Sequence, residues 1–151
     1  MIGTVLDSSI DDHDGDGLYE AFVITGLKDG DYVDYSDATV YFVANDLKTD
    51  ILLNDSAGSY VTSSPDTEDY FLIWNQTFGG PGGTAYVYGC RNGKWYQPKI
   101  PDTCDSFWIQ NGVYSGIVSD YDYGYHRYIS NTYIFDRAKS EFVKIGEELL
   151  V

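Results

Sequence analysis

The chain consists of short β-type segments separated by turn residues, and this pattern restricts its fold more than any other feature. Runs rich in Tyr, Thr, Val, Phe and Ile alternate with Gly, Asp and Asn at short intervals. No stretch combines the 3.6-residue apolar period of a helix with helix caps. The sequence therefore predicts a single all-β domain over residues 1–151. The expected strands are 19–24, 38–44, 50–53, 70–74, 84–90, 95–100, 107–110, 112–119, 127–136 and 141–145.

The segments also recur three times in the same order. Each unit has a Thr-containing strand centred on a tyrosine, and these tyrosines are separated by 45 and 47 residues: Tyr41, Tyr86 and Tyr133. An acidic residue precedes the first strand of each unit by two residues: Glu20, Asp69 and Asp105. A lysine lies in the turn that follows the tyrosine strand: Lys48, Lys94 and Lys139. The units span approximately 12–55, 61–100 and 101–147, and several strands per unit at this period are typical of propeller blades.

Three units leave the overall architecture open. A closed propeller usually needs four or more blades, so three blades predict a partial or open propeller, or a fragment that other chains complete. The apolar stretch 2–6 could add a closing strand to the last unit. A β-trefoil also has three units in about this length, and a β-sandwich is a further alternative.

The charge of the chain is strongly acidic and unevenly distributed. Asp and Glu number 24 against 9 Lys and Arg, a net charge of −15, of which −11 lies in residues 1–55. Such a chain lacks the basic surface that binds nucleic acid or an anionic membrane. No run reaches the roughly 18 apolar residues of a membrane span. No signal-peptide pattern is visible, which predicts either an intracellular protein or a mature, trimmed form.

The most specific motif is an acidic loop in the first unit, DHDGDGLYE over residues 12–20. Carboxylates at positions 1, 3, 5 and 9 surround Gly17, which permits a sharp backbone turn. Ca²⁺ prefers six to eight oxygen ligands, and alternate residues of a tight loop can supply them. Without a cation these carboxylates repel one another. The predicted ligands of one Ca²⁺ ion are Asp12, Asp14, Asp16, the carbonyl of Leu18, and Glu20.

An EF-hand does not fit this loop. An EF-hand needs a bidentate Glu at position 12 and a following helix. Position 12 here is Val23, within a β-branched segment that ends at Gly26. The loop is therefore expected to lead into a strand.

An acidic loop before a strand resembles the calcium loops of FG-GAP and VCBS repeats, the integrin-like propeller family. The resemblance is strongest over 12–24 and weaker over 69–97 and 105–145. It implies propeller-like blades, the ligand set given above and an extracellular adhesion or recognition role. Two departures from the family pattern are the Glu at position 20, where Asp is usual, and the second and third units, which keep only the last acid. One Ca²⁺ site is therefore expected, not three.

Two other groups of residues are candidate features. Cys90 and Cys104 lack the spacing of a zinc motif and can close a disulfide in an oxidising compartment, although two separate thiols are the alternative. A dense aromatic run could offer a stacking platform for a sugar or peptide, and ordinary cross-strand packing is its alternative. The residues of this run are Trp108, Tyr121, Tyr123, Tyr125 and His126.

These observations predict a non-catalytic protein. The histidines are His13, expected to point out of the acidic loop, and His126, and no signature of a nucleophile or metalloprotease is present. The preferred interpretation is an extracellular Ca²⁺-binding β-repeat module that recognises a protein or a carbohydrate. The alternative is a small acidic intracellular inhibitor or immunity-type protein that blocks a basic partner.

Overall fold

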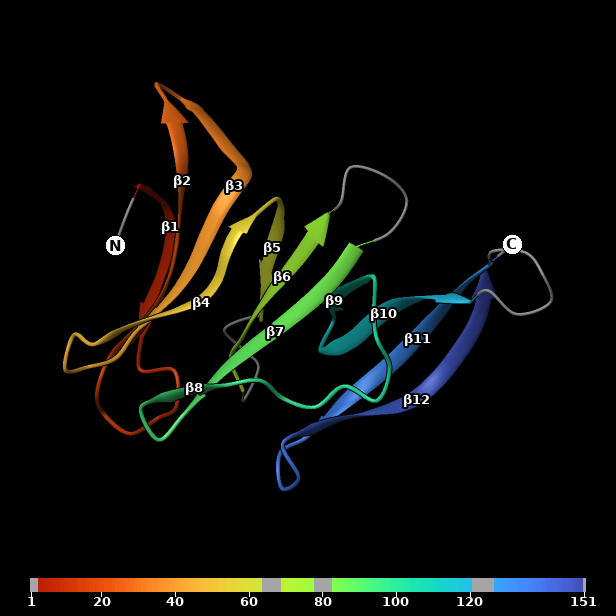
Figure 1. Cartoon of the computed structure of the whole chain (residues 1–151). Coiled ribbons are helices and arrows are strands. Elements are labelled where there is room, and N and C mark those ends of the chain that lie inside the picture. Colours follow the sequence, from red (N-terminus) through yellow and green to blue (C-terminus); the bar gives the residue numbers. More distant parts are fainter. Residues whose placement is uncertain (1–2, 64–68, 78–82, 121–126, 151) are drawn as a thin grey trace.

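The computed structural model describes residues 3–63, 69–77, 83–120 and 127–150, and it is built from three antiparallel sheets (Figure 1). Each sheet contains four strands that follow one another in the chain. The first sheet contains β1 (Thr4–Asp11), β2 (Glu20–Asp29), β3 (Tyr32–Val43) and β4 (Thr49–Ser56). The second contains β5 (Gly58–Thr62), β6 (Phe71–Thr77), β7 (Gly83–Arg91) and β8 (Lys94–Tyr96). The third contains β9 (Ser106–Gln110), β10 (Val113–Asp120), β11 (Arg127–Asp136) and β12 (Glu141–Leu150).

The all-β prediction is confirmed. Within the described ranges every regular element is a strand, so none of these residues forms a helix that could cross a membrane. The repeated tyrosines Tyr41, Tyr86 and Tyr133 all lie in the third strand of their sheets, β3, β7 and β11.

Two parts of the predicted repeat are wrong. Asp105 precedes β9, the first strand of its sheet, whereas Glu20 and Asp69 precede or begin second strands. The repeat pattern therefore matches β9, the first strand of the third sheet, to the second strands of the other two sheets. The two strands are easily confused in the sequence, because β9 and β10 are both apolar and are joined only by Asn111-Gly112. The N-terminal stretch also belongs to the first sheet, since β1 pairs with β2 from Thr4↔Gly26 onward and closes no later unit.

The second sheet is buried on both faces, and β6 explains how. Four consecutive side chains of β6 are at most 2 % exposed, and alternate residues point to opposite faces of a sheet. Leu72 and Trp74 join a core shared with Phe22, Val40 and other residues of the first sheet. Phe71 and Ile73 join a core shared with Phe107, Tyr114, Tyr133 and Phe142 of the third sheet. The continuous apolar run of β6 thus holds the three sheets together.

Polar side chains fix the contacts between neighbouring sheets. The Asn75 amide donates to the Phe107 carbonyl at 3.1 Å and accepts from the Phe107 N–H at 2.8 Å, so it links β6 to β9. On the other side, Trp74 Nε1 donates to Ser56 Oγ at 2.9 Å and links the second sheet to the first. These bonds satisfy buried polar groups and set the relative positions of the sheets.

The predicted Cys90–Cys104 disulfide is not formed. Both thiols are free and buried. Cys90 packs in the core between the first and second sheets, and Cys104 packs in the core between the second and third. The second sheet therefore lies between the two thiols.

Thiol reactivity offers a direct check of this arrangement. We expect a thiol reagent such as Ellman's reagent to react with neither cysteine in the native protein, because burial hinders access and raises the pKa of both thiols. Denaturation without reductant should release two reactive thiols. Finding none after denaturation would mean that the disulfide exists.

A candidate cation loop between the first two sheets

The acidic loop connects β1 to β2, so it leads into a strand, as the sequence predicted. Glu20 is the first residue of β2 and does not precede it by two residues. Gly15 and Gly17 adopt φ angles of +76° and +87°. This left-handed region is unfavourable for residues with a Cβ, so glycine is needed where the loop reverses direction. The turn brings alternating carboxylates to one side of the loop.

The carboxylates are oriented by backbone N–H groups of the loop itself. Asp12 accepts from Asp16 N at 3.0 Å and from Gly17 N at 2.8 Å. Asp16 in turn accepts from Leu18 N at 2.8 Å. These short-range bonds explain why this spacing of Asp and Gly forms a compact loop before any ion binds.

Four of the predicted ligands meet. Carboxylate oxygens from these residues lie within 4.8 Å of one another: Asp12, Asp14, Asp16 and Glu20. Such a group can hold a metal ion. The Leu18 side chain is half exposed, and the role of its carbonyl as a further ligand stays a prediction.

Glu20 is the unusual member of this group. Its side chain is only 2 % exposed. Oε2 accepts the His13 N–H at 3.2 Å, but the buried Oε1 has no hydrogen-bond partner among the described residues. A buried carboxylate oxygen without a partner is costly, and a proton, a water molecule or a bound cation satisfies such an atom.

The pKa shifts agree with this geometry. Burial raises the pKa of Glu20, and the neighbouring Asp14, Asp16 and Asp12 charges raise it further, against one lowering bond from His13 N–H. The pKa of Asp16 is also raised, because desolvation and the Asp14 and Asp12 carboxylates outweigh its bond from Leu18 N–H. Repulsion in the loop is therefore felt most by these two residues.

Asp14 connects the loop to the second sheet. Its Oδ2 accepts the Gly93 N–H at 2.5 Å and lies 3.8 Å from Cys90 Sγ. Gly93 belongs to the Asn92-Gly93 turn between β7 and β8, where both residues have positive φ, as a type I′ hairpin requires. Burial raises the pKa of Asp14, but the Gly93 and Asp16 N–H groups lower it more, so the net shift is downward. Sequence reasoning missed these contacts because they join residues 76 and 79 positions apart.

His13 does not simply point outward. Its ring stacks on Tyr70 at 4.1 Å between centroids, and Nε2 lies 3.0 Å from the Ser9 carbonyl. The histidine thus turns away from the carboxylates, as expected, but packs against the second sheet instead of entering solvent. The loop is held against the second sheet on this side as well.

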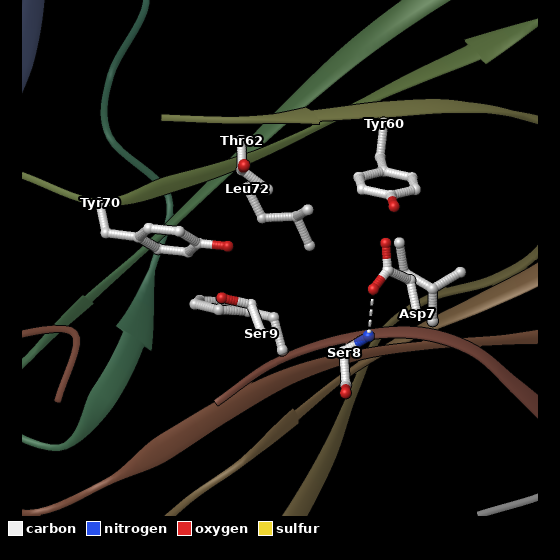
Figure 2. Close-up of a pocket in the computed structure, with 9 residues that line it drawn as sticks. Asp7, Ser8, Ser9, Tyr60, Thr62, Tyr70 and Leu72 are labelled. Carbon is white, nitrogen blue, oxygen red and sulfur yellow. Dashed lines mark hydrogen bonds between the residues drawn. The ribbon is translucent and has the colours of Figure 1, made fainter. Parts of the chain in front are cut away.

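A cavity of about 260 Å³ lies between the first two sheets, beside the His13–Tyr70 stack (Figure 2). Figure 2 shows Tyr60 and Tyr70 reaching toward Asp7 and Ser9 across the space. The Tyr70 hydroxyl is buried beside the Ser9 and Thr62 side chains, and burial raises its pKa more than these two neighbours lower it. The cavity therefore offers hydroxyl groups, one carboxylate and aromatic rings together, a combination that the sequence did not signal.

The predicted aromatic platform can be followed only in part. Trp108 lies in β9, paired with Ser115 of β10, and is half-buried. The other members, Tyr121, Tyr123, Tyr125 and His126, lie outside the described residues.

Comparison with protein-family models, with curated proteins and with solved structures finds no match to this chain. The features of the chain that bear on its function are therefore the loop, the cavity and the arrangement of the sheets.

Proposed function

We propose that this protein is a non-catalytic Ca²⁺-binding module made of propeller-like β-sheets, which acts outside the cell in adhesion or in recognition of a glycan or protein. The observation that carries this proposal is Glu20, whose buried Oε1 lacks a partner in the described structure and whose carboxylate groups with those of Asp12, Asp14 and Asp16. A cation bound there supplies the missing partner and neutralises the repulsion between the carboxylates.

The donor set favours Ca²⁺ over other common cations. The four side chains Asp12, Asp14, Asp16 and Glu20 are hard oxygen donors on a loop, and Ca²⁺ accepts six to eight such donors in flexible geometry. Mg²⁺ needs a near-ideal octahedron and keeps several waters. The Leu18 carbonyl and water molecules complete the coordination in this proposal.

The cation has a structural role in this proposal. Asp14 contacts the β7–β8 turn of the second sheet, while Glu20 begins β2 of the first. An ion shared by these two carboxylates fixes the loop against both sheets. Three successive four-stranded meanders support the propeller-like part of the proposal, as blades of a partial or open ring.

Calcium is expected to stabilise the folded protein. After chelation, adding Ca²⁺ to ten times its Kd should raise the free energy of unfolding by about 1.4 kcal/mol, because the ion binds only the folded state. Thermal unfolding followed by circular dichroism measures the shift. Asp16→Asn should reduce the response. Asp46→Asn is the matched control, since Asp46 accepts Lys48 N in another turn and lies outside the cluster. An unchanged melting temperature in the wild type would refute the proposal.

The recognition part of the proposal draws support from the cavity in Figure 2. Sugars are bound by hydroxyl, carboxylate and aromatic groups acting together, and Tyr60, Thr62, Tyr70 and Asp7 provide such groups there. Its volume suits one small ring. Because both thiols are free, a disulfide no longer supports the proposed extracellular location.

The inhibitor alternative is favoured by a different feature, the acidic arm of residues 27–37. β1 pairs with β2 only as far as Gly26, and β4 pairs with β3 only from Ala38, so the arm forms strand pairs only within itself and extends beyond the sheet (Figure 1). Within the arm, Tyr35 packs against Tyr60 and Trp74 of the second sheet. The arm carries four acidic residues against one lysine: Asp29, Asp31, Asp34, Asp37 and Lys28. The exposed Leu27 and Tyr32 add apolar contact area. Such an arm suits the active-site cleft of a basic enzyme.

One pair of binding experiments separates these two functions. The recognition module should bind defined sugars on a glycan array, with binding weakened in Tyr60→Phe, which keeps the ring and removes the hydroxyl. The inhibitor should instead bind purified basic nucleases, with binding weakened when Asp29, Asp31 and Asp34 are all changed to Asn. A protein that binds only basic nucleases would overturn the preferred function.

A further inference from the structure

Cys90 packs next to two carboxylates of the acidic loop, Asp14 and Glu20. Its Sγ lies 3.8 Å from Asp14 Oδ2, and single ligand atoms of Asp14, Glu20 and Cys90 lie within 4.8 Å of one another. Cys90 and Glu20 are 8 % and 2 % exposed. The buried thiol therefore lies beside the carboxylate of Glu20, whose Oε1 has no hydrogen-bond partner among the described residues.

This arrangement is poorly explained by Ca²⁺ alone. Ca²⁺ coordinates oxygen atoms, so a sulfur beside two of its ligands adds nothing to binding. Zn²⁺ and similar borderline ions accept sulfur and carboxylate oxygen together, usually from four tetrahedral ligands. At the metal distances of such sites, sulfur and oxygen ligands lie about 3.5 Å apart. The observed 3.8 Å between Sγ and Asp14 Oδ2 is close to that spacing.

We propose that Asp14, Glu20 and Cys90 form a three-ligand site for a divalent transition ion of the Zn²⁺ class, with water in the fourth position. Asp14 and Glu20 also belong to the proposed Ca²⁺ site, so the two ions exclude each other. The inference shares that loop with the proposed function but does not require Ca²⁺ to bind. Binding replaces the hydrogen bond from Cys90 to Asp14 with a sulfur–metal bond, and the thiol proton passes to solvent. No atom is oxidised or reduced.

Co²⁺ makes this site visible, because it substitutes for Zn²⁺ and absorbs light when bound to thiolate. The protein, freed of metal with a chelator, is titrated with Co²⁺ and followed for a thiolate-to-Co²⁺ charge-transfer band in the near ultraviolet. We expect the band in the wild type and in Cys104→Ser, whose altered thiol lies on the far side of the second sheet. Zn²⁺ added in equimolar amount should remove it. Absence of the band in the wild type would overturn the proposal.

Cys90 variants decide which thiol binds. Cys90→Ser should abolish the band and weaken Zn²⁺ binding at least tenfold in competition with a chromophoric chelator. Cys90→Ala is measured beside it, and circular dichroism confirms that each variant folds. A band that persists in a folded Cys90 variant refutes the assignment.

The same variants keep this proposal separate from the calcium proposal. Cys90→Ser retains all four loop carboxylates, so Ca²⁺ should still raise its melting temperature. If the wild type ignores Ca²⁺ but shows the Cys90-dependent Co²⁺ band, the calcium proposal fails and the mixed site stands. If Ca²⁺ stabilises the protein and no band forms, only the mixed site fails.

Discussion

Glu20→Gln is expected to raise stability without Ca²⁺ and to lower it with Ca²⁺. In calcium-free buffer the change removes a buried charge that Asp12, Asp14 and Asp16 repel, so the free energy of unfolding should rise by about 1–2 kcal/mol. With Ca²⁺ the amide is a weaker ligand. We expect affinity to fall about 100-fold, or about 2.7 kcal/mol, a loss that exceeds the gain when Ca²⁺ is present at about a thousand times the wild-type Kd.

Denaturant unfolding of both proteins, with Ca²⁺ and with chelator, measures the two effects. Glu147→Gln is the matched control, because Glu147 is exposed and pairs with Lys144 at 3.0 Å. A surface pair of this kind contributes about 0–1 kcal/mol, and Ca²⁺ should not alter its effect. A Glu20→Gln protein that is less stable than the wild type in both buffers would show that the carboxylate serves the fold, not an ion.

The dependence of this difference on pH has a defined sign. The pKa of Glu20 is raised in the folded state, so its charge destabilises the calcium-free protein above that pKa. As the pH falls through the raised pKa the penalty shrinks, and it is gone below the ordinary pKa of glutamate. The advantage of Glu20→Gln should therefore be largest near neutral pH and vanish in acid. Asp14, whose pKa is lowered, has the opposite dependence, but it is present in both proteins and largely cancels.

How much of the site the sequence could predict depended on how far apart the residues lie in the chain. The carboxylates at 12, 14, 16 and 20 and the strand that follows are local features, set by residue spacing and by glycine at positive φ. The contacts of Asp14 with Gly93 and Cys90 depend on the packing of the second sheet against the first. No local pattern encodes that distance.

The fold shows the same division. Strand-forming composition and the spacing of Tyr41, Tyr86 and Tyr133 were enough to place three third strands. They were not enough to assign β9 and β10, since both match the pattern of a second strand. The predicted disulfide between Cys90 and Cys104 is wrong for a related reason. Fourteen residues of separation allow a disulfide, but the second sheet lies between the thiols, and only the packing of the cores reveals this.

Phe142→Ala is expected to cost about 3–5 kcal/mol, the usual range for a buried phenylalanine. Phe142 lies in β12 and is 2 % exposed. Its ring centroid is 4.8 Å from that of Tyr114, 5.2 Å from that of Phe107 and 5.4 Å from that of Phe71. Removing it leaves a cavity at the centre of the core between the second and third sheets. Val143→Ala is the control, because Val143 is the next residue, is 38 % exposed and should cost much less.

The same variant tests whether the three sheets unfold together. Phe71 and Ile73 of β6 face the core that Phe142 fills, while Leu72 and Trp74 of the same strand face the core beside the acidic loop. Loss of one core therefore loosens the strand that supports the other, so we expect Phe142→Ala to unfold in a single transition at lower urea concentration. Circular dichroism and tryptophan fluorescence should coincide. Because Phe142 packs in the core between the second and third sheets and the loop lies beside the other core, Ca²⁺ should stabilise this variant and the wild type by the same free energy. Two transitions, with Ca²⁺ moving only the later one, would instead mean that the third sheet unfolds independently of the cation loop.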